Sequence, residues 1–90
     1  MALIFEWDEK KAQTNLAKHN VSFEEAATVF ADERSLTIDD PVHSVSEKRY
    51  ITLGLAHTKK LLVVVHMIRR EKIRIISART ASRKERLQYA

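Results

Sequence analysis

The chain has 90 residues, no cysteine and a formal net charge of +4, with 16 Lys or Arg against 12 Asp or Glu. This length suits a single domain, spanning residues 1–90, with one modest core, and the lack of Cys excludes a disulfide framework and a thiolate metal site. No apolar run approaches the ~20 residues that span a bilayer, and the first residues lack the pattern of a signal peptide. We therefore expect a cytoplasmic protein with no membrane partner.

The first residues predict a short strand followed by a helix. Residues 3–7 are prone to form a strand, and Asp8 suits the N-cap of a helix that runs to about His19. Asn20 can close this helix in the left-handed conformation. Trp7 precedes the cap and can fold back onto the helix, so we expect it in the core.

A second helix is predicted from residue 23. Ser22 and Glu25 have the spacing of a capping box, which marks the start of a helix. The helix would place Ala26, Val29 and Phe30 toward a core. Both predicted helices therefore lie before the main strands of the chain.

Four strand-forming segments follow, separated by turn signals. A polar loop is expected at residues 39–46, and residues 69–71 turn the chain between the last two segments to make a hairpin. Ser82 and Glu85 form another capping box, which starts a short terminal helix. This order predicts an α+β fold, in which a small antiparallel sheet packs with two N-terminal helices and a short C-terminal helix. The strands are expected at residues 36–38, 49–55, 61–65 and 73–77.

The positive charge is concentrated near the C-terminus. Residues 69–86 contain eight Lys or Arg and two Glu, a net charge of +6, whereas residues 1–68 contain eight Lys or Arg and ten Asp or Glu, a net charge of −2. Such a local surplus favours a polyphosphate backbone as partner, although a solvated basic helix would have the same composition. Arg74, Arg83 and Arg86 are the candidate contacts to nucleic acid in this segment.

Motifs along the whole chain carry one resemblance. In chain order they are FEWD at residues 5–8 with Lys11, Asn15, Lys18 and His19; VSFEEA at 21–26; Glu47 and Arg49; and IRIISAR at 73–79 with Glu85, Arg86 and Tyr89. Together they resemble the BrnT toxins of bacterial type II toxin-antitoxin systems. The resemblance implies a RelE-like fold and cleavage of RNA, with mRNA as the expected target, which inhibits translation. It also implies neutralisation by a BrnA-like antitoxin, including a higher-order complex with an antitoxin dimer, and an acidic segment of that partner would suit residues 69–86.

Cleavage of RNA without a metal requires a base for the 2′-hydroxyl, cations for the phosphate and an acid for the leaving oxygen. Glu47 and Arg49 are two residues apart at the entrance of a strand, so an extended backbone sends both side chains to one face. We expect Glu47 as a candidate base, Arg49 and Arg79 as phosphate ligands, and His19 as acid or base. The alternatives are a structural ion pair for Glu47 and Arg49 and, for His19, an imidazole favoured by the helix dipole.

Further RNA contacts are predicted on the first helix and at the C-terminus. Lys11, Asn15 and Lys18 would form one polar stripe with His19, which either borders the RNA-binding groove or is a solvated face. Tyr89 would either stack on a base or pack the last helical turn against the sheet.

Other features point away from metal or cofactor chemistry. Asp39, Asp40 and His43 match no established metal-ligand spacing, and neither a P-loop nor a dinucleotide-binding motif is present, so we expect no metal and no cofactor. His66 continues an apolar strand and is expected in the core. The competing function is a non-catalytic nucleic-acid-binding or protein-interaction module that uses the basic C-terminal surface.

Overall fold

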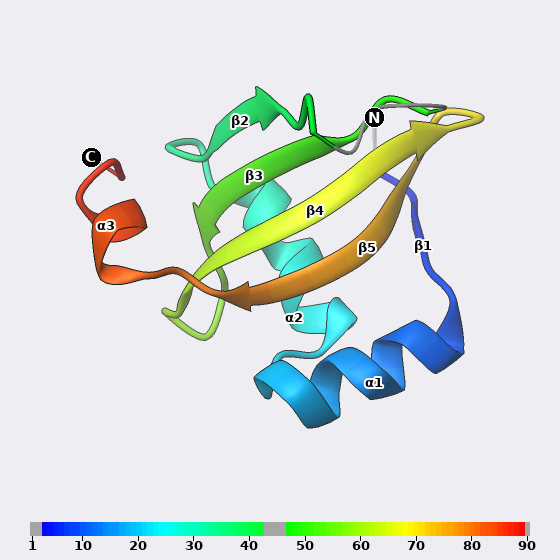
Figure 1. Cartoon of the computed structure of the whole chain (residues 1–90), viewed down its shortest axis with the longest axis horizontal. Coiled ribbons are helices and arrows are strands. Elements are labelled where there is room, and N and C mark those ends of the chain that lie inside the picture. The colour runs from blue at the N-terminus through cyan, green and yellow to red at the C-terminus, as the bar shows by residue number, and fades with distance from the viewer. Residues whose placement is uncertain (1–2, 43–46, 90) are drawn as a thin grey trace.

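The computed structural model describes residues 3–42 and 47–89, which form an α+β fold around one five-stranded sheet (Figure 1). None of the described helices is long and apolar enough to cross a membrane. The strands are β1 (Phe5–Glu6), β2 (Leu36–Asp39), β3 (Tyr50–Leu55), β4 (Leu61–Arg69) and β5 (Lys72–Thr80), and the helices are α1 (Glu9–His19), α2 (Phe23–Ala27), the 3₁₀ helix η1 (Thr28–Ala31) and α3 (Arg83–Arg86).

The sheet is mixed, which corrects the antiparallel sheet predicted from the sequence. Its order is β1-β5-β4-β3-β2, and four of the strands pair antiparallel with their neighbours. β1 instead pairs in parallel with β5, where Phe5 lies opposite Ile73 and Glu6 opposite Arg74. A parallel pair needs a long connection, and here the whole of the chain between β1 and β5 supplies it, so no local turn signal marks the pairing. The α+β class is confirmed.

The predicted hairpin is confirmed and is longer than its apolar segments suggested. β4 extends to Arg69, and a two-residue turn of Arg70 and Glu71 leads into β5. Both turn residues have positive φ, 52° and 65°. Two left-handed residues match the right-handed twist of the flanking strands, which is why such turns favour tight hairpins.

The caps of α1 confirm the sequence-based boundaries. The Asp8 carboxylate accepts a hydrogen bond from the Lys11 N–H at 3.1 Å. Asn20 is left-handed, with φ 57° and ψ 33°, and its N–H donates to the Leu16 carbonyl oxygen. α1 therefore ends where Asn20 redirects the chain into α2.

The two predicted capping boxes differ in outcome. At α3, Ser82 and Glu85 bond to each other's backbone N–H groups, so this box is complete. At α2, the Ser22 hydroxyl accepts from the Glu25 N–H at 3.0 Å, but the Glu25 carboxylate accepts from the Thr58 hydroxyl instead of the Ser22 N–H. Only half of the predicted box forms there, because a tertiary partner competes for the carboxylate.

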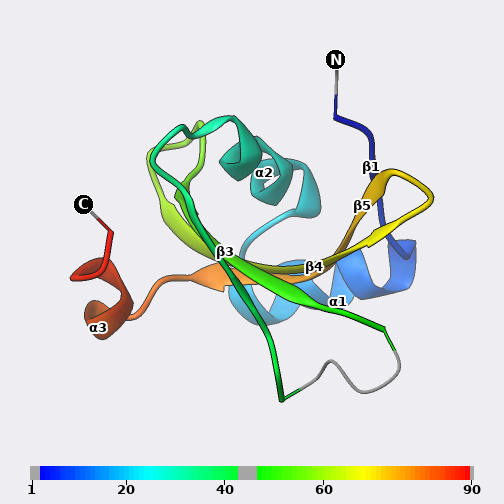
Figure 2. The same cartoon turned by 90° about the horizontal axis from the view of Figure 1, so that it is seen from above.

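The main core lies between the sheet and the helical layer. Figure 1 shows α1 running alongside β5, and Figure 2 shows α2 on one side of the sheet. Trp7 packs edge-on against Phe23 with ring centroids 5.9 Å apart, which confirms the prediction that Trp7 belongs to the core. Complete burial of one large apolar side chain contributes about 1.5–3 kcal/mol to folding. Fully buried side chains in this layer include Val21, Phe23, Val29, Leu62, Val64 and Ile75.

His66 is a core residue, as predicted. It is 4% exposed, its Nε2 lies 2.8 Å from the Thr52 hydroxyl, and that hydroxyl lies 2.7 Å from the hydroxyl of Thr37. The ring also packs edge-on against Phe30 at 4.8 Å. Its Nδ1 is buried and has no hydrogen-bond partner in the described part of the chain. Burial lowers the pKa of His66 to about 4.

This pKa predicts a loss of stability in mild acid. An unfolded histidine titrates near pH 6.5, so between about pH 6.5 and 4 the unfolded chain binds a proton that the folded protein excludes. The free energy of unfolding should therefore fall as pH is lowered through this range, by about 3 kcal/mol for the full shift. His66→Gln should flatten the dependence between pH 7 and 4.5, measured by urea unfolding, whereas the exposed control His57→Gln should retain it. An equal slope in the His66 variant would contradict the assignment.

Candidate functional site

Strand β5 has a free edge over most of its length. β1 pairs only with Ile73 and Arg74, so the following backbone faces α1 instead of another strand. Asn15 of α1 fills this edge, since its Nδ2 donates to the Ala78 carbonyl oxygen at 2.8 Å and its Oδ1 accepts from the Ala78 N–H at 3.1 Å. Nδ2 also donates to the Val21 carbonyl oxygen at 2.9 Å, and the residue is 6% exposed. Asn15 is thus a buried brace and not part of the solvated stripe.

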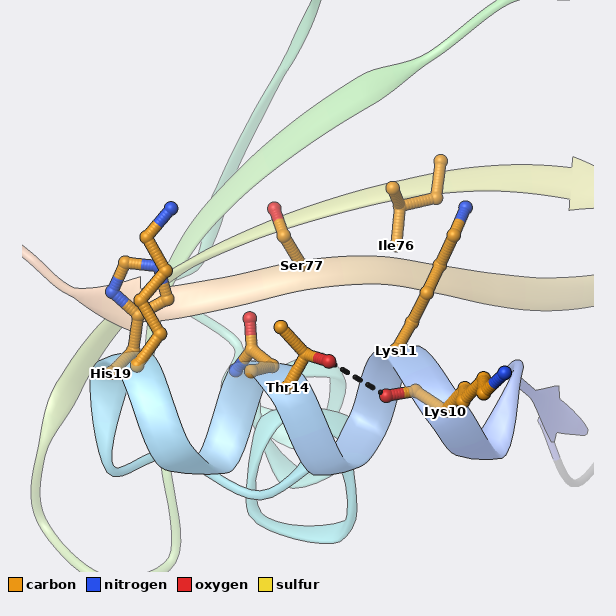
Figure 3. Close-up of a pocket in the computed structure, with 8 residues that line it drawn as sticks. Lys10, Lys11, Thr14, His19, Ile76 and Ser77 are labelled. Carbon is orange, nitrogen blue, oxygen red and sulfur yellow. Dashed lines mark hydrogen bonds between the residues drawn. The ribbon is translucent and has the colours of Figure 1, made fainter.

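A hollow of about 410 Å³ lies between α1 and β5 (Figure 3). Three lysines and one histidine line it, and none of its described lining residues is acidic. In Figure 3, Lys11 and Ser77 point to the same side of α1 and β5, and His19 stands at the end of the helix. The lining residues are Lys10, Lys11, Thr14, Asn15, Lys18, His19, Ile76 and Ser77. This charge pattern suits an anionic ligand.

A second hollow of about 380 Å³ adjoins the first at β5. A β-bulge lies at the junction, because Val65 pairs with Ser77 and His66 with Ile75, which leaves Ile76 without an opposite residue. Bulges redirect side chains, and here Ile76 and Ser77 line both hollows. We call the two hollows together the groove. The second one is lined by Asp40, Val42, Arg49, Ile51, Val65, Ile76 and Ser77.

The groove collects five of the residues predicted from the sequence, namely Lys11, Asn15, Lys18, His19 and Arg49. Glu47 is not among its lining residues. Both Glu47 carboxylate oxygens accept from Nη2 of Arg69, at 2.8 and 3.0 Å, and the side chain is 49% exposed. Glu47 therefore forms an ion pair with Arg69 at the end of β4. Its spacing to Arg49 in the sequence did not indicate this partner.

Arg79 also has a carboxylate partner. Its two terminal nitrogens donate to the two oxygens of Glu85, each at 2.8 Å. Arg79 and the N-cap Ser82 together lower the pKa of Glu85 to about 2, and Glu85 raises the pKa of Arg79. This bidentate pair links the start of α3 to β5, the strand that also contains Ser77.

The basic segment at residues 69–86 is divided between the two ends of β5. At the hairpin end, Arg74 pairs with Glu6 at 3.4 Å. A small hollow there is also bordered by Arg69, Arg70 and Lys72. The exposed residues Arg83, Lys84 and Arg86 lie on α3. The six residue steps of β5 from Arg74 to Thr80 separate the two groups by about 20 Å at ~3.3 Å per residue. One acidic segment would have to follow the whole strand to contact both.

Tyr89 anchors the chain after α3. Its hydroxyl donates to the Asp32 carboxylate at 2.6 Å, and its ring packs against the apolar cluster of Leu53, Leu61 and Val63. The bond raises the pKa of Tyr89 and lowers that of Asp32, which also accepts from backbone N–H groups. This is the packing alternative of the two predicted for Tyr89.

The remaining polar candidates are His57 and His43. His57 is exposed and contacts Thr28, and His43 lies outside the described residues. Within residues 3–42 and 47–89, no group of three or more His, Asp or Glu side chains is placed to hold a metal ion.

Four polar groove residues were not assigned a role at the RNA site from the sequence, namely Lys10, Thr14, Ser77 and Asp40. Ser77 was visible as a polar residue two positions before Arg79, but its place at a junction depends on the bulge. Asp40 looked like a loop residue, and only the pairing of β2 with β3 brings it beside Arg49, where its N–H donates to the Arg49 carbonyl oxygen at 2.9 Å.

Comparison with known proteins agrees with the motifs. The family model described as "Ribonuclease toxin, BrnT, of type II toxin-antitoxin system" matches residues 7–85. The crystal structure of the Brucella abortus ribonuclease toxin BrnT superposes with a TM-score of 0.66 at 24% identity, over 91% of this chain and 100% of that one, and shows a common fold. No relative was found among curated proteins. Because the family model covers most of the chain, the protein belongs to the BrnT family of ribonuclease toxins of type II toxin-antitoxin systems.

Proposed function

We propose that this protein is an endoribonuclease that cuts mRNA in the groove without a metal ion and thereby inhibits translation. The observation that best supports this is the continuity of the groove across Ser77, with Lys11, Lys18 and His19 on one side and Arg49 on the other. A phosphate at Ser77 would have cations on both sides. Such cations stabilise the charge that develops on a phosphate during cleavage.

Each of these residues has a chemical role in the proposed reaction. Arg49 offers a planar fork that can hold two phosphate oxygens, whereas Lys11 and Lys18 act as point charges. His19, at the end of α1, would protonate the leaving 5′ oxygen. Glu47, the base suggested by the sequence, would serve only after its carboxylate leaves Arg69.

RNA beyond the scissile phosphate would extend toward α3. Arg79 would exchange Glu85 for a phosphate there, because both ligands present two oxygens to the same fork. Arg83 and Arg86 would contact the following phosphates, Tyr89 would stack on a base after leaving Asp32, and Arg74 would serve RNA at the hairpin end.

The same groove is the surface that an antitoxin must block. We propose a BrnA-like antitoxin, alone or as a dimer in a larger complex, that occludes the groove in the cytoplasm. Contacts with exposed cations of α1 and α3 would speed its association.

Cleavage should not require a metal. In excess EDTA, the protein should cut a single-stranded RNA and leave a 2′,3′-cyclic phosphate on the upstream fragment, because the 2′-hydroxyl is the nucleophile. A substrate with one 2′-deoxy position at the cut site should resist cleavage there. Product ends can be identified by mass spectrometry. Activity that chelation abolishes and magnesium restores would contradict the mechanism, and binding without any cleavage would favour the non-catalytic module.

A matched pair of variants should separate RNA contact by Arg79 from support of α3. Arg79→Ala removes a charge-assisted contact and should weaken binding of a 2′-O-methyl RNA about tenfold. Glu85→Gln retains a cap for the Ser82 N–H but frees the guanidinium, so it should bind this RNA at least as tightly as wild type. Fluorescence anisotropy at fixed salt gives both affinities. Equal weakening in the two variants would mean that Arg79 serves only to hold α3.

A further inference from the structure

The groove contains a carboxylate that the sequence did not single out as a base. Among its described lining residues, Asp40 is the acidic one, and the other charged members are Lys10, Lys11, Lys18 and Arg49. Only 6% of Asp40 is exposed. An ionised carboxylate is costly to bury, and Asp40 lies at the wall of a cationic groove.

The pairing of β2 with β3 fixes where Asp40 lies. Ile38 is opposite Ile51, and two residues further along, Asp40 is opposite Arg49, joined by the 2.9 Å bond from its N–H to the Arg49 carbonyl oxygen. Because side chains alternate along a strand, Asp40 is on the same face as Ile38, and Arg49 on the same face as Ile51. The carboxylate and the guanidinium therefore border the hollow that ends at Ser77.

Resting on the proposed ribonuclease function, we propose that Asp40 is a catalytic residue and acts as the general base. A phosphate at Ser77 has Asp40 and Arg49 on one side and His19 on the other. The 2′-hydroxyl of the upstream nucleotide faces Asp40 in this arrangement. Glu47 is a poorer base here, because Arg69 holds both of its oxygens outside the groove.

The reaction balances with groups of the groove alone. The Asp40 carboxylate takes the proton of the 2′-hydroxyl as that oxygen forms a bond to phosphorus. The bond from phosphorus to the 5′ oxygen breaks, and His19 gives its proton to that oxygen. The products are a 2′,3′-cyclic phosphate and a 5′-hydroxyl, and proton exchange with water restores both side chains.

The test compares neighbouring amides in the intact protein. Asp40→Asn keeps the shape of the side chain but cannot accept the proton, so kcat for a fluorogenic RNA should fall at least 100-fold, the usual scale of general-base catalysis. Its affinity for the 2′-O-methyl RNA should stay within threefold. Asp39→Asn is the matched control, since Asp39 is exposed and pairs with Lys48, and it should cleave at the wild-type rate.

Cleavage by folded Asp40→Asn within threefold of wild type would overturn the inference while leaving the ribonuclease function intact. A wild-type protein that cuts no RNA would instead overturn the proposed function itself. If Asp40→Asn does not fold, as judged by circular dichroism, Asp40→Glu decides. It keeps a carboxylate but lengthens the side chain by one methylene, so kcat should fall severalfold while affinity for the 2′-O-methyl RNA stays unchanged. An unchanged kcat would refute the role of Asp40.

Discussion

The amide of Asn15 is the interaction on which the arrangement of this protein depends. It meets both the N–H and the carbonyl oxygen of Ala78 and also the carbonyl oxygen of Val21, so one side chain joins α1, the loop after it and the free edge of β5. A buried hydrogen bond contributes only about 1 kcal/mol net, but loss of this amide would leave three backbone groups unsatisfied, at about 1–3 kcal/mol each. Removing the Asn15 side chain would thus cost much more stability than the net contribution of its hydrogen bonds. This position therefore requires an amide.

The position of α1 beside β5 brings residues from several elements together to form the groove. The solvent side of α1 supplies lysines and His19, the paired strands supply Asp40 and Arg49, and the bulge at Ile76 joins the two hollows. The charge of the C-terminal segment contributes less directly, because Arg74 and Arg79 each have an acidic partner and lie far apart along β5. Local potential at the groove comes mainly from residues outside that segment.

The sequence was informative wherever a structure is determined by neighbours along the chain. The Asp8 and Asn20 caps, the hairpin and the burial of His66 follow from local patterns of polarity and backbone preference, and the structure confirms them. Contacts between distant residues were not predictable in this way. The parallel pairing of β1, the Asn15 brace and the partner of Glu47 each depend on how elements meet, and a polar side chain on a helix has the same local pattern whether it is solvated or buried. The family motifs pointed to the function, but the assignment of roles within the site needed the register of the sheet.

RNA should bind in the groove that Asn15 lines, and not mainly on the basic end of the chain. Backbone amide shifts measured by NMR during titration with a 2′-O-methyl RNA test it most directly. The largest changes are expected at Lys11, His19, Arg49 and Ser77, with smaller ones along α3. Changes confined to residues 83–86 or to the hairpin turn at Arg70 and Glu71, with the groove amides unmoved, would contradict it.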